Sequence, residues 1–462
     1  MSEVLLTKAE RIVKIAEVKG AKQAQALVYS FDDAFSRFSR NTLNQSEVYE
    51  DQGVYLEIEK ADKTYSSAFI RTVKEEELTK IIDMLLRQAR LEERPPFTTS
   101  SNIQPINGTY DKKTAELTDK ERAEAVRLAI QASLDYSKKI TKASGTLTTR
   151  IAHVALANSF GISLIHSYTG CSLVCTPLAE DNSSLGVGFA SQNTRSFSEI
   201  NIEKIAEEAS EDAVMSVNPK PIDLGRYDVI FQSDAAGDVI GSFVQLGFST
   251  IREENYVEIG SLCSSELLTV SDEPRNLDTL LPRAFDAEGI QTANVVLIDK
   301  GVAKEMCFDL RLAAKANRKS SGHAVFPHDV TYSSKFFIGW VYYPFNQIVK
   351  AGNVTKQDMI REAEKAILVK RLMYAGLPSG VCKKDVMQAH TMGTWLIEKG
   401  QIKHPLPSLR ISASLKKLVK NIISVGDVNS VKKLGCINTP WLTIRDVLFT
   451  EMSSLSTPEN VL

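Results

Sequence analysis

The stretch RYDVIFQSDAAGDVIGSFVQLGFSTIREENYVEIG, from Arg226 to Gly260, decides the fold of the last part of this chain. Its short apolar run, Tyr227 to Phe231, is bounded by polar residues and predicts a β-strand. Ser233 and Asp234 are residue types that favour a helix N-cap, and residues 235–248 predict a helix. We therefore expect a strand to lead directly into a helix in the middle of the last domain.

This predicted helix carries almost no metal-ligating side chain. Residues 235–248 include no His, no Cys and no Glu, and their one carboxylate is that of Asp238. A zinc ion needs imidazole, thiolate or carboxylate ligands, and a hydrolytic zinc also needs a general base beside its water. The helix alone therefore predicts no metal centre.

Motifs elsewhere in the chain resemble the TldD/PmbA family, known as zinc-dependent peptidase subunits and, from an older label, as modulators of DNA gyrase. The most specific match is a Phe-Asp-x-Glu-Gly turn at residues 285–289, supplied by Phe285, Asp286, Glu288 and Gly289. Gly301 fits the hairpin turn that follows in the family, and Ser321-Gly322 fits a later Ser/Thr-Gly step. The resemblance extends, in the family's order, from about residue 24 to about residue 450.

The resemblance also indicates which branch of the family this chain is similar to. In the TldD branch the equivalent helix has the pattern HExxxH, and alignment of the preceding strands puts its positions on Gly241, Ser242 and Leu246. The TldD branch has a further Cys ligand after a late helix, where this chain has VNSVKKLG at 428–435, and Cys436 does not take that role. The chain thus resembles the PmbA branch, also called TldE, which lacks the motif, and we expect no catalytic residue and no metal ligand in it.

This resemblance implies a function in peptide degradation. It implies a non-catalytic, zinc-free subunit of a TldD/TldE-type metallopeptidase complex that degrades or processes unfolded peptides. The expected partner is a TldD-like chain that brings the zinc and the general base, or a second copy of this chain, and no cofactor is expected in this chain. An unfolded peptide would pair along a sheet edge, which gives sequence-tolerant recognition of the backbone.

Two other functions stay open at this point. One is a self-associating peptide-binding or scaffold protein without peptidase activity, and the other is a hydrolase with a site of its own. No GxSxG elbow and no GxxxxGK phosphate loop occurs in the sequence. Activity of the single chain would favour the hydrolase, and a cell without a TldD-like partner would favour the scaffold.

Composition limits the class of protein. The chain has 462 residues, of which 43% are hydrophobic and 24% charged, as in ordinary globular proteins of two or three domains. The net charge of −2 argues against nucleic-acid binding, and no apolar run reaches the roughly 20 residues needed to span a membrane. Because the N-terminal residues also lack the apolar core of a signal peptide, we expect a cytoplasmic protein.

The patterning predicts an α+β fold with three segments, at residues 1–94, 109–217 and 222–462. We expect a helix-flanked antiparallel N-terminal part, in which the first two segments form one layer, and a large β-rich C-terminal domain. Apolar periodicity predicts helices over 4–19, 75–91, 118–140, 355–374 and 414–427, and strands over 24–31, 54–59, 65–70, 146–158 and 162–174. Asn158 and Gly161 suit a hairpin turn with positive φ.

Several polar side chains are candidates for chemistry or for structure. Asp286 and Glu288 could be paired acids, but carboxylates at a glycine turn more often accept backbone N–H bonds, and we favour that interpretation. The set Arg37, Asn41 and Gln45 fits either turn capping or substrate contact. His323 and His328 are five positions apart without an evident third ligand, so they predict no metal site. The six cysteines, at 171, 175, 263, 307, 382 and 436, predict free and mostly buried thiols.

Overall fold

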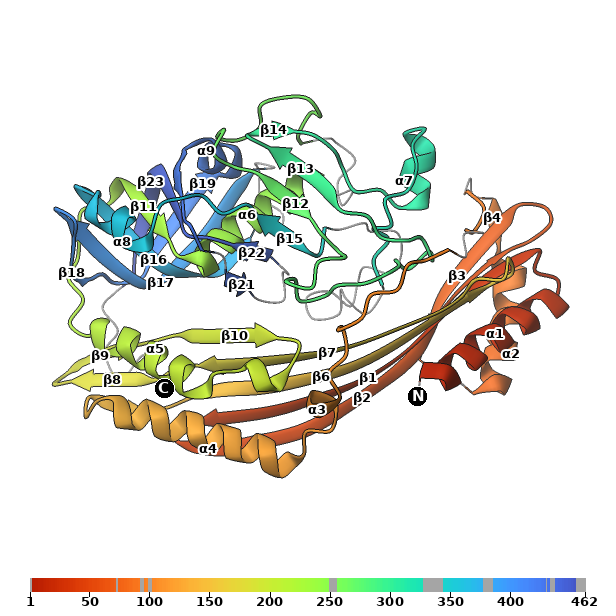
Figure 1. Ribbon diagram of the computed structural model, residues 1–462, viewed down its shortest axis with the longest axis horizontal. Coiled ribbons are helices and arrows are strands. Elements are labelled where there is room, and N and C mark those ends of the chain that lie inside the picture. The colour runs from red at the N-terminus through yellow and green to blue at the C-terminus, as the bar shows by residue number, and fades with distance from the viewer. Residues whose placement is uncertain are drawn as a thin grey trace.

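The computed structural model describes residues 2–71, 74–91, 95–98, 102–248, 256–326, 344–376, 385–428, 430–432 and 437–453. It has two layers, a long curved antiparallel sheet with its helices and a β-rich C-terminal domain above it (Figure 1). The expected α+β class is confirmed. No helix among the described residues is both long enough and apolar enough to cross a membrane.

The N-terminal layer is a seven-stranded antiparallel sheet to which the first two segments of the chain both contribute. Its central pair, β1 and β6, joins residues from these two segments over fourteen positions, from Gln25 opposite Asn158 to Phe38 opposite Gly145. In spatial order, the strands are β10 (Ala190–Thr194), β7 (Ser163–Cys175), β6 (Gly145–Asn158), β1 (Gln23–Ser39), β2 (Thr42–Glu59), β3 (Thr64–Ile70) and β4 (Arg90–Leu91).

Both faces of the central strands are covered, and alternation along β1 shows what covers each face. Ala24, Ala26 and Val28 pack in one apolar cluster with helix α1 (Ser2–Val18) and helix α2 (Glu75–Gln88). The intervening Leu27, Tyr29 and Phe31 pack in another cluster with Phe285 and Phe326 of the C-terminal domain. Because successive strand residues point to opposite faces, the sheet separates these helices from the C-terminal domain.

The other end of the sheet carries two long helices and a small second sheet. The helices are α4 (Asp119–Tyr136) and α5 (Ile202–Met215), and the small sheet has the order β5 (Ile140–Lys142), β8 (Leu178–Asp181), β9 (Ser184–Val187). Thr118 caps α4 in a complete capping box with Glu121. Two short helices complete this layer, α3 (Lys112–Ala115) and the 3₁₀ helix η1 (Phe197–Glu199).

The C-terminal domain contains a closed ring of strands. The sheet order is β11-β16-β17-β19-β23-β20, with β18 on β17, and an additional β11–β23 pairing closes five of the strands into a ring. Only the β11–β16 pair among these is parallel. The bounds are β11 (Gly225–Phe231), β16 (Lys365–Gly376), β17 (Val386–Glu398), β18 (Gln401–Pro405), β19 (Leu409–Ser414), β20 (Ile422–Val425) and β23 (Leu442–Met452).

A second C-terminal sheet lies beside this ring, and helix α6 (Ser233–Phe248) packs between the two. This second sheet has the order β14 (Val302–Ala303), β13 (Val295–Asp299), β12 (Val270–Asp272), β15 (Gln347–Val349), β22 (Ile437–Thr439), β21 (Ser430–Lys432). The remaining described helices are short: α7 (Leu310–Lys315), α8 (Lys356–Arg361) and α9 (Leu415–Lys420).

The prediction of a helix over 355–374 is wrong. Helix α8 ends at Arg361, and the rest of the stretch is strand β16. Along β16, Ile367 and Val369 face the α6 core, whereas Ala366 and Leu368 face a second core with Trp395. A continuous apolar run buried on both faces suits a central strand as well as a helix, and pairing with β11 and β17 selects the strand.

Several other expected elements need correction at their ends. The helix predicted over 118–140 ends at Tyr136, before β5 begins at Ile140. The strands predicted over 24–31 and 54–59 are parts of longer strands, β1 and β2. The helix predicted over 414–427 stops at Lys420 and β20 follows, and the helix predicted over 75–91 ends at Gln88. Helix α6 begins at Ser233, so Ser233 and Asp234 form its first turn. At the β6–β7 hairpin Gly161 has a positive φ of 84°, as expected, but Asn158 does not. Its side chain instead accepts the N–H groups of Phe160 and Ile162.

Candidate functional site

Helix α6 is where the family pattern would place a hydrolytic zinc, and the structure shows which way its side chains point. The helix residues that are not buried, Asp238, Gly241, Ser242 and Gln245, recur at helical spacing and form one stripe. Leu246 lies outside that stripe, is only 4% exposed and belongs to the main C-terminal core. Gly241 and Leu246 therefore occupy different faces of α6, and neither side chain can bind a metal.

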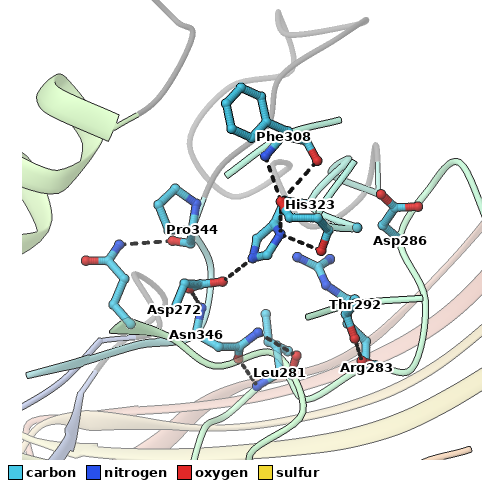
Figure 2. Close-up of polar contacts among 12 residues, drawn as sticks. Asp272, Leu281, Arg283, Asp286, Thr292, Phe308, His323, Pro344 and Asn346 are labelled. Atoms are coloured by element: carbon cyan, nitrogen blue, oxygen red, sulfur yellow. Dashed lines mark hydrogen bonds and ion pairs between the residues drawn. The ribbon is translucent and has the colours of Figure 1, made fainter. Parts of the chain in front are cut away.

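A buried polar network lies beside this core, where the interior strand β12 of the second C-terminal sheet ends (Figure 2). Asp272 is the last residue of β12, and its Oδ2 atom is 2.8 Å from Nε2 of His323. Its other oxygen, Oδ1, accepts the backbone N–H of Asn346 at 2.6 Å. Because both carboxylate oxygens are hydrogen-bonded, the buried charge of Asp272 is compensated within the protein.

The second ring nitrogen of His323 has two partners on one residue. Nδ1 lies 2.9 Å from the Ser321 hydroxyl and 3.0 Å from the Ser321 carbonyl oxygen. The same hydroxyl accepts the backbone N–H of Phe308 at 2.7 Å. A protonated Nδ1 can donate to the Ser321 carbonyl, and an unprotonated Nδ1 can accept from the Ser321 hydroxyl. Either tautomer of the imidazole therefore has a hydrogen-bond partner at Nδ1.

Cys307 completes a cluster with this pair. Its sulfur, a His323 ring nitrogen and an Asp272 oxygen all lie within 4.8 Å of one another. Burial, aided by the negative charge of Asp272, raises the pKa of the Cys307 thiol well above its usual range. No hydrogen bond joins this sulfur to any residue that the structure describes, so as a thiol it is inert.

Sequence reasoning missed this cluster. It considered His323 only with His328, which lies outside the described residues, and found no third ligand. The three side chains come from positions 272, 307 and 323, and no local spacing connects them. The one available indication was that Cys307, His323 and Asp272 each adjoin or lie within short apolar stretches, where polar residues are usually paired.

The turn at Asp286 and Glu288 binds backbone groups, as the sequence interpretation favoured. Asp286 accepts the backbone N–H groups of Glu288, Ile290 and Ala324. Glu288 accepts the N–H of Leu310. Gly289 has φ of 74°, and a Cβ atom there would lie 2.8 Å from Leu156 of β6, so the turn requires glycine at the contact between the layers.

Burial shifts the titration of both turn carboxyls. It raises the pKa of Asp286 to about 6 against the effect of the three N–H bonds. It raises the pKa of Glu288 well above 4.5, and the neighbouring Asp286 carboxylate adds to the shift. Two carboxyls this close and this buried retain a proton more readily than isolated ones.

The other residues considered from sequence lie apart from these sites. Asn41 forms the β1–β2 turn at φ 67° and bonds the backbone of Thr141 and Ala143. Arg37 and Gln45 are opposite each other on β1 and β2, and Gln45 bonds Glu47 at the surface. Capping and strand-edge roles account for these contacts. Cys171, Cys175, Cys263 and Cys307 are buried free thiols, as expected, whereas Cys382 and Cys436 lie outside the described residues.

A cavity of about 360 Å³ lies where the two layers meet. Its walls are the loop 103–110, the start of β7 and the segment Ala284–Phe285. The titratable groups on its lining are those of His166 and Tyr110, and the lining includes no carboxylate or thiol. The cavity therefore offers no paired acids and no metal-ligand set for hydrolysis.

Comparisons with known proteins agree with this architecture. Residues 112–217 match the family model described as PmbA/TldA metallopeptidase central domain, and residues 224–451 match the PmbA/TldA metallopeptidase C-terminal domain. The fold and these matches define a metallopeptidase-related α+β protein. The chain belongs to the PmbA/TldD family.

Individual relatives are distant in sequence and similar in fold. The chain is 24% identical over 329 residues to metalloprotease PmbA of Escherichia coli O157:H7, covering 70% of this chain and 68% of that one. It is 23% identical over 332 residues to a PmbA homologue of Buchnera aphidicola, covering 70% and 69%. The structure of TldE from Thermococcus kodakarensis superimposes with a TM-score of 0.79 at 18% identity, over 96% of this chain and 100% of that one. A Thermotoga maritima protein described as a candidate modulator of a DNA gyrase gives 0.82 at 17% identity, over 96% and 99%.

Proposed function

We propose that this chain is the subunit without hydrolytic zinc in a TldD/TldE-type metallopeptidase complex that degrades or processes unfolded peptides. The partner in this proposal is a TldD-like chain that carries the zinc and the general base. The observation that carries the proposal is the make-up of α6, where Gly241, Ser242 and Leu246 occupy the motif positions and Leu246 lies in the apolar core. A metallopeptidase fold without these groups can bind substrate but lacks the means to activate water.

An open strand edge supports the peptide-binding part of the proposal. The first half of β2, Thr42 to Gln52, pairs with β1, and the β3 pairing begins only at Val54. No described strand pairs with the outer edge of this half, and nearly all of its residues are exposed. Unpaired backbone N–H and C=O groups can receive an extended peptide as an additional strand, whatever its side chains.

Reconstitution tests the proposal. The chain alone is expected to leave an unfolded protein such as casein intact, and to support cleavage once mixed with a HExxxH-bearing chain from the same cell. A metal chelator should abolish that cleavage, and the HExxxH chain alone is the control for the contribution of this subunit. Chelator-resistant cleavage by this chain alone would mean that it has a hydrolytic site of its own. A cytoplasmic location remains a prediction.

A substitution of Asp286, one of the two acids in the 285–289 turn, distinguishes an effect on folding from an effect on catalysis. Asp286→Ala leaves three N–H groups, two of them buried, without their acceptor and is expected to cost about 3 kcal/mol of unfolding free energy. Asp286→Asn keeps one oxygen acceptor and should cost less. Folded complex should nevertheless retain near-normal turnover, because Asp286 bonds backbone groups and has no proposed part in catalysis. Removal of a general acid or base would instead lower turnover by roughly 10²–10⁴-fold. An Asp286→Ala complex that melts normally yet loses turnover on that scale contradicts the non-catalytic assignment.

The alternative is a self-associating peptide-binding or scaffold protein, which would use the same open β2 edge. A second copy of the chain could pair there in place of a peptide. Glu47, Glu50 and Asp51 make this edge acidic, which disfavours close antiparallel self-pairing. Light scattering of the single chain, with and without the TldD-like partner, distinguishes the two: a stable homodimer that excludes the partner supports the scaffold.

A further inference from the structure

We propose that Asp272, Cys307 and His323 form a buried site for one divalent cation of the zinc class, distinct from α6 and structural in role. The three ligand atoms already converge to within 4.8 Å. The side chains are 1%, 0% and 1% exposed, so no bulk solvent separates them. They come from the end of β12, from the segment that follows β14, and from the segment that follows α7, so an ion would join three distant parts of the chain.

The donor set indicates the class of metal. A thiolate sulfur, an imidazole nitrogen and a carboxylate oxygen are the ligand types of tetrahedral zinc sites, whereas calcium and magnesium require oxygen ligands. One carboxylate and one thiolate would neutralise a divalent cation, which allows the complex to remain buried. The sequence alone predicts no metal in this chain, and this proposal differs from that expectation because the tertiary structure brings two further ligands, Asp272 and Cys307, to His323.

The hydrogen bonds around the cluster are those that hold ligands in place. Oδ1 of Asp272 is fixed by the N–H of Asn346, which leaves Oδ2 for the cation. Nδ1 of His323 has the Ser321 carbonyl at 3.0 Å as an acceptor, so Nε2 can be the unprotonated ligand atom. A ligating histidine typically donates its other ring N–H to a carbonyl or carboxylate in this way. The Ser321 hydroxyl in turn holds the N–H of Phe308, the residue that follows Cys307.

The same contacts describe the molecule without the ion. In that state Nε2 donates its proton to Asp272 at 2.8 Å, and the Ser321 hydroxyl donates to Nδ1 at 2.9 Å. Cation binding releases the thiol proton of Cys307 and requires the His323 ring proton to move from Nε2 to Nδ1, where it is donated to the Ser321 carbonyl. Zinc–ligand bonds of about 2.0–2.3 Å require Nε2 and Oδ2 to separate by roughly 0.5 Å. That movement is small, and the thiol has no hydrogen bond to a described residue that would have to break.

The burial of the three ligand side chains indicates that the ion would have a structural role. A catalytic zinc keeps an open position for water and substrate, whereas these three side chains are almost completely buried. The site therefore does not restore hydrolysis to this chain. It would instead stabilise the second C-terminal sheet, in which β12 lies between β13 and β15.

Cobalt substitution of the single chain tests the site without any activity measurement. The reduced chain is loaded with Co²⁺, freed of excess metal by gel filtration, and analysed for metal content and absorption. We expect about one Co²⁺ per chain with a thiolate-to-cobalt charge-transfer band, and displacement of Co²⁺ by Zn²⁺. Absence of bound metal, or metal without the thiolate band, overturns the proposal whatever the outcome of the peptidase reconstitution.

Variants locate the metal. Cys307→Ser should lose the thiolate band, and Asp272→Asn, which keeps the shape of the side chain, should lower Co²⁺ affinity about tenfold or more. Cys263→Ser is the matched control, because Cys263 is a buried thiol of the same core that bonds the Gly301 carbonyl and lies outside the cluster. If Cys307→Ser fails to fold, the Asp272→Asn result decides. Retention of full affinity and of the band in Asp272→Asn would place the metal elsewhere and refute the site.

Discussion

At the scale of single residues, the turn 285–289 shows how burial changes the chemistry of two carboxyls. Asp286 serves as acceptor for three backbone N–H groups, and Glu288 for one. Glu57, buried in β2, is a further negative charge that raises the pKa of Glu288. The turn therefore retains protons that the unfolded chain would release.

This retention has a consequence for stability as a function of pH. Both folded pKa values lie above the unfolded ones, near 3.8 and 4.5, so the folded state binds more protons in the window between them. The contribution of Asp286 and Glu288 to the free energy of unfolding is therefore greatest at low pH. It is lost as the pH rises through about 6 and above.

Glu288→Gln should reduce this dependence. Glutamine keeps an oxygen acceptor for the Leu310 N–H and does not titrate, so the variant should lose less unfolding free energy than the parent between about pH 5 and about pH 8. Urea unfolding at both pH values measures the difference. Glu77→Gln, at an exposed position of α2, is the control and should follow the parent. An unchanged pH slope in Glu288→Gln would mean that Glu288 is already ionised.

At the scale of elements, α6 combines a buried helix with a narrow open stripe. Its apolar side chains pack toward β11 and β16 on one side, and Gly237 lies against Ile437 of β22 on another. Any side chain placed on the buried faces has to fit a close-packed interior. The register of the helix thus decides which positions could ever carry a ligand.

Leu246→His tests this register. The imidazole would replace a core leucine and leave its nitrogens without water, so we expect a loss of about 3 kcal/mol or more and no gain in zinc affinity. Gln245→His, one position earlier on the exposed stripe, should change stability by less than about 0.5 kcal/mol. Thermal melts of both variants, with and without Zn²⁺, give the comparison. Equal stability of the two variants would show that Leu246 does not face the core.

At the scale of the whole molecule, the two layers are joined at both ends. At one end the 285–289 turn packs on β6, and Gln25 of β1 bonds the carbonyl oxygen of Ala287. At the other end Lys370 of β16 pairs with Asp212 and Glu208 of α5, and the Trp395 indole bonds the carbonyl oxygen of Met215. These contacts fix the C-terminal domain over the curved sheet (Figure 1).

Lys370→Met should weaken this junction in a pH-dependent way. Lys370 is 7% exposed, and without it the Asp212 carboxylate is buried and unpaired, which typically costs about 3 kcal/mol or more. Burial already raises the pKa of Asp212 to about 6 despite the pairing with Lys370. The unfolding loss should therefore be large near pH 8 and smaller near pH 5, where Asp212 can take up a proton. Adding Asp212→Asn should restore stability at pH 8, and a loss independent of pH would contradict this account.

Local sequence determined much of this protein by itself. The absence of His, Cys and Glu from α6 is a property of sixteen consecutive residues and needs no tertiary information. The capping box at Thr118 and the β6–β7 hairpin are likewise set by neighbouring residues, and the Asp286 turn by side chains that bond nearby backbone groups.

Only the tertiary structure decided the identity of β16 and the cluster around His323. The run Ala366 to Val369 fits a helix or a strand, and its pairing with β11, more than a hundred residues earlier, selected the strand. Asp272 and His323 are 51 positions apart, and β12 meets the segment after α7 only because the second C-terminal sheet forms. Such long-range contacts depend on loop closure and on the burial of distant apolar faces. The spacing of neighbouring residues in the sequence predicts neither.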